Sequence, residues 1–170
     1  MLKLNLGCGA FPKESFINLD SRGDLSRIFH ERHAKGDGPA YVIEEWSFID
    51  DLLYDSGTVD AVTESHALMY LRPEDYVDLF TEIHRVLKPG GIFRITEDNC
   101  ERPVEELKLD GLPWGTPASV TGPKMMRAEL EKVFTIVIDV APDKTSYVDQ
   151  SLIRRITALR LESFIWRQSK

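Results

Sequence analysis

The sequence predicts a single α/β domain with a Rossmann-like, doubly wound and mostly parallel sheet in a three-layer α/β/α arrangement. Short apolar runs of strand length alternate with segments of helical spacing. A glycine pair directly follows the first of these runs. The 170 residues can build one substantial core but not two. Because the last two predicted strands lack a full-length helix between them, we expect an antiparallel C-terminal edge. Residues 1–170 are therefore expected to form one domain.

The first predicted strand has leucine at positions 2, 4 and 6 and ends at Gly7-Cys8-Gly9. A second strand is predicted at Phe16–Asp20. The later runs of strand length are Tyr41–Ile43, which we expect to be buried, Val59–Thr63, Ile92–Thr96, Thr135–Val140 and Leu159–Trp166.

Three helices are predicted between these strands. A short one is expected at Ser26–His33. The clearest helix begins near Pro73 and is stopped by Pro89-Gly90-Gly91. Its apolar residues recur at helical spacing: Tyr76, Leu79, Phe80, Ile83 and Leu87. A third helix is expected at Lys124–Phe134. Three prolines and three glycines between Asn99 and Gly122 predict an irregular segment over one end of the sheet.

Composition narrows the classes of function and location. The formal net charge of −7 disfavours a protein that binds nucleic acid through phosphate contacts. Cys8 and Cys100 lack metal-ligand spacing, so no metal site is predicted and free thiols in a reducing cytoplasm are expected. The first glycine comes too early for a signal peptide, and no stretch is long and apolar enough to span a bilayer. We expect a cytoplasmic protein without a membrane partner.

Two early features point to a ligand at one end of the sheet. Gly7-Cys8-Gly9 follows the first strand, where backbone without side chains can approach a ligand closely. A plain strand-to-helix turn would fit equally well. Asp20 ends the second strand, where one carboxylate can accept both hydroxyls of a ribose; the alternative is an acid that caps the following turn. Pro12 replaces the third glycine of a dinucleotide fingerprint, which disfavours a nicotinamide enzyme.

Four segments together resemble the compact class I S-adenosylmethionine-dependent methyltransferases: Leu4–Gly9, Phe16–Asp20, Val59–Leu71 and Glu82–Thr96. The likeness is strongest to short members tied to saccharide or envelope biosynthesis, in which the first helix is reduced. The resemblance implies S-adenosylmethionine as cofactor. It places Leu6, Gly7, Cys8 and Gly9 along the methionine and ribose portion, Asp20 on the ribose hydroxyls, and Ser65 and His66 near the sulfonium and the acceptor.

The sequence departs from the family pattern in two places. The acid that accepts the adenine amino group is ambiguous among Glu44, Glu45, Asp50 and Asp51; we favour Glu45, with Trp46 stacking on the adenine. Leu68-Met69-Tyr70 replaces the family's usual Leu-Glu-His, which indicates a different acceptor pocket.

The predicted function is methyl transfer to a small-molecule acceptor, with a saccharide or metabolite hydroxyl as one class. His66 is then the first candidate base, ahead of Glu64 and Tyr70, although a capping or buried structural histidine is an equal alternative. We expect the acceptor under Glu97–Pro123, with Trp114 in its wall. A non-catalytic S-adenosylmethionine-binding regulatory or partner module is the main competing hypothesis. A homodimer that completes the pocket is a further expectation.

Overall fold

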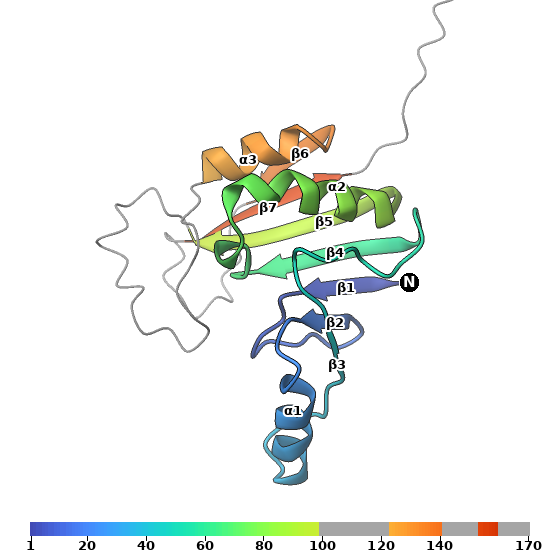
Figure 1. Ribbon diagram of the computed structural model, residues 1–170, viewed down its shortest axis with the longest axis vertical. Helices are drawn as coiled ribbons and strands as arrows, with labels where there is room; N and C mark the ends of the chain where they lie inside the picture. The colour runs from blue at the N-terminus through green and yellow to red at the C-terminus, as the bar shows by residue number, and fades with distance from the viewer. Residues whose placement is uncertain (99–122, 141–152, 160–170) are drawn as a thin grey trace, which may run out of the picture.

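The computed structural model describes residues 1–98, 123–140 and 153–159. They form a seven-stranded sheet in the order β3-β2-β1-β4-β5-β7-β6 (Figure 1). The strands, in that order, are Ile43–Glu45, Ile17–Asp20, Lys3–Leu6, Val59–Ser65, Leu87–Asp98, Ile153–Leu159 and Ile136–Val140. Neighbours from β3 to β5 are parallel, whereas β7 runs antiparallel to both β5 and β6. The predicted mostly parallel sheet with an antiparallel C-terminal edge is confirmed.

The helices are α1 (Leu25–Ala34), α2 (Tyr76–Val86) and α3 (Pro123–Glu131), with short 3₁₀ turns η1 (Leu68–Tyr70) and η2 (Pro73–Asp75) before α2. Figure 1 shows α2 and α3 together over the β4–β5–β7–β6 part of the sheet, while α1 lies at the β3 edge, away from them. All three predicted helices are confirmed to within a few residues. None of the described helices is long and apolar enough to cross a membrane.

The core lies between α2 and the sheet. Leu79, Phe80 and Ile83 are buried on one face of the helix, and they share a single cluster with the buried strand residues. The Phe80 ring lies 5.9 Å from the Phe93 ring on β5, measured between centroids. Helix α2 is thereby fixed on the sheet, and the residues before it are held at the C-terminal end of β4.

Helix α2 ends at Val86, earlier than its apolar spacing predicts. The residue before a proline disfavours helical backbone, and Lys88 precedes Pro89. Strand β5 then begins at Leu87, and its register with β4 shifts between the Val59–Leu87 and Ala61–Ile92 pairs. The Pro-Gly-Gly turn is therefore an irregularity within β5, and Gly90 has a φ of 78° there.

One strand prediction is wrong, and another can be compared with the structure at only one of its residues. Tyr41–Ile43 is not a buried strand: β3 is Ile43–Glu45 at the edge of the sheet, and Val42 is 70% exposed. The structure has β7 at Ile153–Leu159, which precedes the predicted run Leu159–Trp166 and shares only Leu159 with it; residues 160–166 lie outside the described part of the chain. Pairing along β5, from Ile92 opposite Leu159 to Asp98 opposite Ile153, sets the position of β7. Apolar runs alone did not reveal that pairing.

A short loop without a helix connects β1 to β2, as the resemblance implied. Two buried asparagines hold it: Asn5 Nδ2 donates to Asn18 Oδ1 at 2.8 Å. The same Asn18 oxygen accepts the Lys13 N–H at 2.7 Å, and Asn18 Nδ2 donates to the Lys13 carbonyl. Side-chain amides thus satisfy backbone groups that a helix would otherwise have paired.

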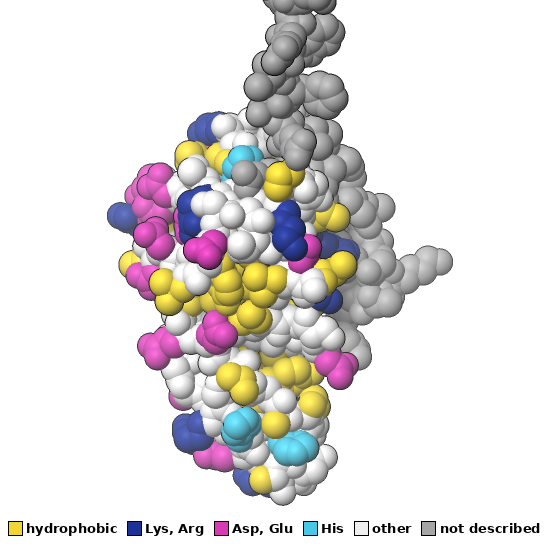
Figure 2. Space-filling model, turned by 90° about the vertical axis from the view of Figure 1, so that its right-hand side faces the viewer, with side chains coloured by type: hydrophobic (Ala, Val, Ile, Leu, Met, Phe, Trp, Pro, Cys, Tyr) yellow, Lys and Arg dark blue, Asp and Glu magenta, His cyan; other side chains and the backbone are white. Residues whose placement is uncertain are grey.

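The parallel strands all end toward one side of the molecule, on the left of Figure 1. Figure 2 shows the other side, where apolar side chains gather in the middle and acidic and basic side chains are interspersed around them. A ligand of a doubly wound sheet binds outside the carboxyl ends of its strands. A ligand site of this kind would therefore lie on the side of the molecule opposite to the view in Figure 2.

Candidate functional site

The glycine loop after β1 is built from two glycines with different surroundings. Both have left-handed backbone, with φ of 58° at Gly7 and 49° at Gly9. A Cβ on Gly7 would collide with the Ala67 Cβ and lie 2.9 Å from Cζ of Phe48, whereas a Cβ on Gly9 would meet no atom of the described residues within 4 Å. Gly7 thus lets the loops after β3 and β4 pack against the end of β1, and Gly9 faces space that none of the described residues fills.

The side chains of Leu6 and Cys8, the two other residues predicted to line the cofactor, are both buried. The Leu6 side chain is fully buried in the main core. The Cys8 side chain packs with Leu25 and Phe29 of α1. Burial, and secondly the charge of Asp20, raises the pKa of the Cys8 thiol to about 12, so this cysteine is a neutral thiol and not a nucleophile.

Asp20 at the end of β2 joins the glycine loop to the following turn. Its Oδ2 accepts the Gly9 N–H at 2.8 Å, and its Oδ1 accepts the Arg22 N–H at 3.0 Å. The side chain is buried, with the residue 8% exposed. Each carboxylate oxygen can accept more than one hydrogen bond. Asp20 therefore caps the turn that follows β2, which was the alternative to a ribose-binding role. Both of its oxygens nevertheless keep acceptor capacity for a ligand.

Glu45 and Trp46 follow each other at the end of β3. Glu45 pairs in register with Asp20, and its Oε2 would lie 2.9 Å from a Cβ on Gly23. Trp46 is only 6% exposed and belongs to the core. Its Nε1 donates to the carbonyls of Asp50 and Asp51 at 3.2 and 3.3 Å. Adenine recognition by these two residues stays a prediction, and most of the indole surface is already covered.

Phe48 is an aromatic residue of the site that sequence reasoning missed. It is partly buried, and its ring lies 5.2 Å from that of Trp46 in an edge-to-face arrangement. The same ring borders Gly7. The available signal was its place two residues beyond Trp46, in the loop that follows the third parallel strand.

Ser65 and His66 end β4 beside β5. His66 has a φ of 57°, a left-handed conformation that costs a non-glycine residue about 1–3 kcal/mol and often marks a functional site. Its N–H donates to the Thr96 carbonyl of β5 at 2.8 Å. The neighbouring Glu64 is fully buried, and its Oε1 accepts the N–H groups of Ala67 and Leu68, which holds the η1 turn. Glu64 therefore has a structural role in this loop.

Several predicted features lie outside the described residues. They are the acceptor wall with Trp114 and most of the segment Glu97–Pro123, as well as Cys100. Arg154 and Arg155 lie on β7, in register opposite Glu97 and Thr96. Within residues 1–98, 123–140 and 153–159, no group of three or more His, Cys, Asp or Glu could hold a metal ion.

Solved structures of other proteins superpose on this chain over most of its length. A SAM-dependent methyltransferase from Archaeoglobus fulgidus superposes with a TM-score of 0.68 at 16% identity, over 93% of this chain and 85% of that one. The methyltransferase SibL in its apo form superposes with a TM-score of 0.67 at 18% identity, over 94% of this chain and 50% of that one. The fold is that of the S-adenosylmethionine-dependent methyltransferases.

Sequence comparisons agree with this methyltransferase fold. Residues 24–95 match a family model described as a methyltransferase domain. The probable methyltransferase ltbC of Aspergillus luteorubrus is 41% identical over 88 residues, which is 51% of this chain and 30% of that protein. The chain thus spans less than a third of this curated relative. These matches support the predicted enzyme class and cofactor; the likeness to saccharide and envelope enzymes stays a prediction.

Proposed function

We propose that this domain binds S-adenosylmethionine over the carboxyl ends of β1 and β2 and transfers its methyl group to a small-molecule acceptor. One observation carries the proposal: the buried Asp20 carboxylate is held by Gly9 and Arg22 N–H groups next to open space at Gly9. The loop after β1, where the resemblance places the cofactor, therefore has a glycine beside an oriented acid.

The residues present fit the cofactor. A ribose offers two neighbouring hydroxyl donors, and both Asp20 oxygens retain acceptor capacity. Because backbone N–H groups already fix the carboxylate, its orientation need not be established on binding. The cofactor supplies an activated methyl group on sulfur, so the protein has mainly to hold acceptor and methyl in line.

His66 is the proposed general base where the acceptor is a hydroxyl, such as that of a saccharide or another metabolite. The strained backbone of this residue lies at the end of β4 and is anchored to Thr96. A base is required only if the acceptor atom loses its proton during attack. For such an acceptor, substitution of His66 should lower turnover and change the pH profile of the reaction, while cofactor binding is retained.

The test of cofactor binding is isothermal titration calorimetry with S-adenosylmethionine and S-adenosylhomocysteine, and NAD as a control ligand. Asp20→Asn removes the charge and one acceptor at nearly constant shape. Hydrogen bonds to charged groups contribute about 1.5–3 kcal/mol, so we expect affinity to fall about 10- to 150-fold. Asp24→Asn is the matched control, because that acid lies in the same turn and is exposed in an ion pair with Arg22.

Absence of wild-type binding to both sulfur ligands would refute the proposal. Binding with unchanged affinity in Asp20→Asn would refute the assignment of the ribose acid. Purified protein is then incubated with labelled cofactor and pools of small hydroxyl-bearing metabolites. Cofactor binding without transfer to any pool would instead favour the non-catalytic module.

A further inference from the structure

The connection from β3 to β4, residues 46–58, is an irregular strap that contains neither helix nor strand. It leaves the carboxyl end of β3 and returns across the sheet to the start of β4 (Figure 1). Because it lacks a regular ladder, its backbone N–H and carbonyl groups need partners from elsewhere. Those partners decide how firmly the strap is held.

The first part of the strap borders the proposed cofactor site. The Trp46 N–H donates to the Asp20 carbonyl at 2.9 Å. Phe48 packs against Gly7. The Trp46 indole N–H then reaches forward to the carbonyls of Asp50 and Asp51, so the turn closes on itself just before Leu52. The position of Leu52 thus bears directly on the turn that touches Asp20 and Gly7.

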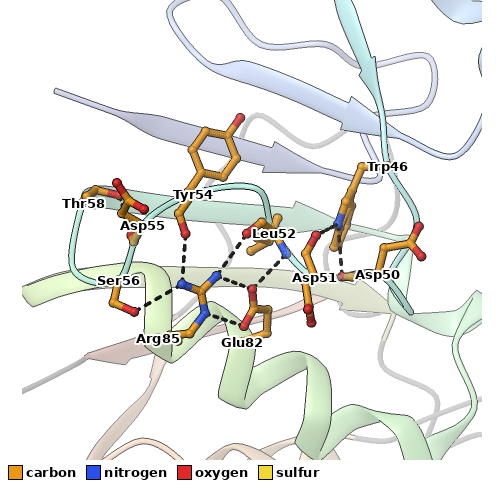
Figure 3. Close-up of polar contacts among 10 residues, drawn as sticks. All are labelled: Trp46, Asp50, Asp51, Leu52, Tyr54, Asp55, Ser56, Thr58, Glu82 and Arg85. Atoms are coloured by element: carbon orange, nitrogen blue, oxygen red, sulfur yellow. Dashed lines mark hydrogen bonds and ion pairs between the residues drawn. The ribbon is translucent and has the colours of Figure 1, made fainter.

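The second part of the strap is clamped by two side chains of α2, as Figure 3 shows. Arg85 Nη2 donates to the Leu52 carbonyl at 3.0 Å, and Nη1 donates to the Tyr54 carbonyl at 3.0 Å. Glu82 Oε1 accepts the Leu52 N–H at 2.9 Å and also pairs with Arg85 Nη2. The buried Leu52 is therefore held at both its N–H and its carbonyl by one ion pair.

The two members of the pair reinforce each other. Glu82 and Arg85 face the same way on α2, three residues apart, and the carboxylate receives both Nε and Nη2 of the guanidinium. The hydrogen bond from Arg85 lowers the pKa of Glu82, and the same contact raises the pKa of Arg85. Only the planar fork of arginine can meet this carboxylate and two carbonyls in different directions; the single ammonium of lysine cannot.

We propose that Arg85 and Glu82 are positioning residues that set the affinity for the cofactor by holding the strap against Gly7 and Asp20. This inference rests on the proposed function. When the clamp is lost, the turn from Trp46 to Asp51 gains freedom that cofactor binding must remove, so the affinity falls. The chain's own α2, which carries core residues on its other side, would thus also shape the cofactor pocket.

The test compares Arg85→Lys with Lys88→Met, a matched control. Lys88 forms a partly exposed ion pair with Asp60 at 2.7 Å, near the starts of β4 and β5, beyond the end of the strap that is opposite to the turn from Trp46 to Asp51. Titration with S-adenosylhomocysteine is performed well below the melting temperature of each variant. We expect Arg85→Lys to bind about three- to thirtyfold more weakly and Lys88→Met to bind as the wild type does.

A second readout needs no ligand. The indole N–H signal of Trp46, in protein labelled with ¹⁵N-tryptophan and assigned with Trp46→Phe, should shift or broaden in Arg85→Lys only. An affinity within about twofold of wild type, an unmoved indole signal, or an equal loss in the control would each overturn the inference. Wild-type protein that binds neither sulfur ligand would instead refute the proposed function, whatever the indole signal does.

Discussion

The two glycines of the first loop should respond differently to the same substitution. Both have left-handed backbone, which costs a non-glycine residue roughly 1–2 kcal/mol. At Gly7 the added methyl group would also collide with Ala67 and Phe48, whereas at Gly9 it would meet none of the residues that the structure describes within 4 Å. Overpacking adds about 1–3 kcal/mol. We therefore expect a loss of about 2–5 kcal/mol for Gly7→Ala and about 1–2 kcal/mol for Gly9→Ala.

Urea unfolding followed by circular dichroism measures both losses as shifts of the midpoint at constant slope. The affinity for S-adenosylhomocysteine is measured on the folded variants. Relative to the stability that each variant loses, Gly9→Ala should lose more affinity than Gly7→Ala. A methyl group on Gly9 enters open space beside the Asp20 carboxylate, where the cofactor is proposed to lie. Equal loss of stability in the two variants would refute the distinction between a packing glycine and a ligand-facing glycine.

Two further predictions concern titratable groups. In a Cys100→Ser background, Cys8 should react slowly with a thiol reagent at about pH 8 and rapidly once urea unfolds the chain, because burial raises its pKa to about 12; fast labelling of the folded protein would contradict this. Arg85 holds the pKa of Glu82 below its ordinary value of 4.5, so Glu82 contributes stability above that pH and loses it as the pH falls through the lowered pKa. Urea midpoints measured from about pH 6 to about pH 3 should therefore decline more steeply in wild type than in Glu82→Gln, and parallel declines would contradict the assignment.

Local sequence signals were sufficient for most of the fold. The helix before the Pro-Gly-Gly turn was recognisable because Tyr76, Leu79, Phe80 and Ile83 recur at a spacing that only a helix can bury on one side. Gly7 and Asp20 were recognisable because they end two parallel strands, and the structure brings them to one end of the sheet. The sequence did not show what Gly7 and Asp20 each contribute at that end, because it does not reveal that Gly7 packs on Phe48.

Long-range pairing decided the rest. The position of β7 depends on hydrogen bonds to β5, and an apolar run near the C-terminus cannot specify a register with a strand about sixty residues earlier. β3 was expected to be buried because Tyr41 to Ile43 are apolar, yet its place at the sheet edge follows from the strand order.

The sequence by itself determined that this chain forms an α/β domain with a glycine loop and an acid at the ends of its first two strands. The tertiary structure alone decided that a strap without regular secondary structure packs against the glycine loop, and that Arg85 and Glu82 bind this strap. The reason is physical: periodicity reports which face of an element is apolar. The partners of an irregular backbone are chosen by whatever side chains the completed fold brings within reach.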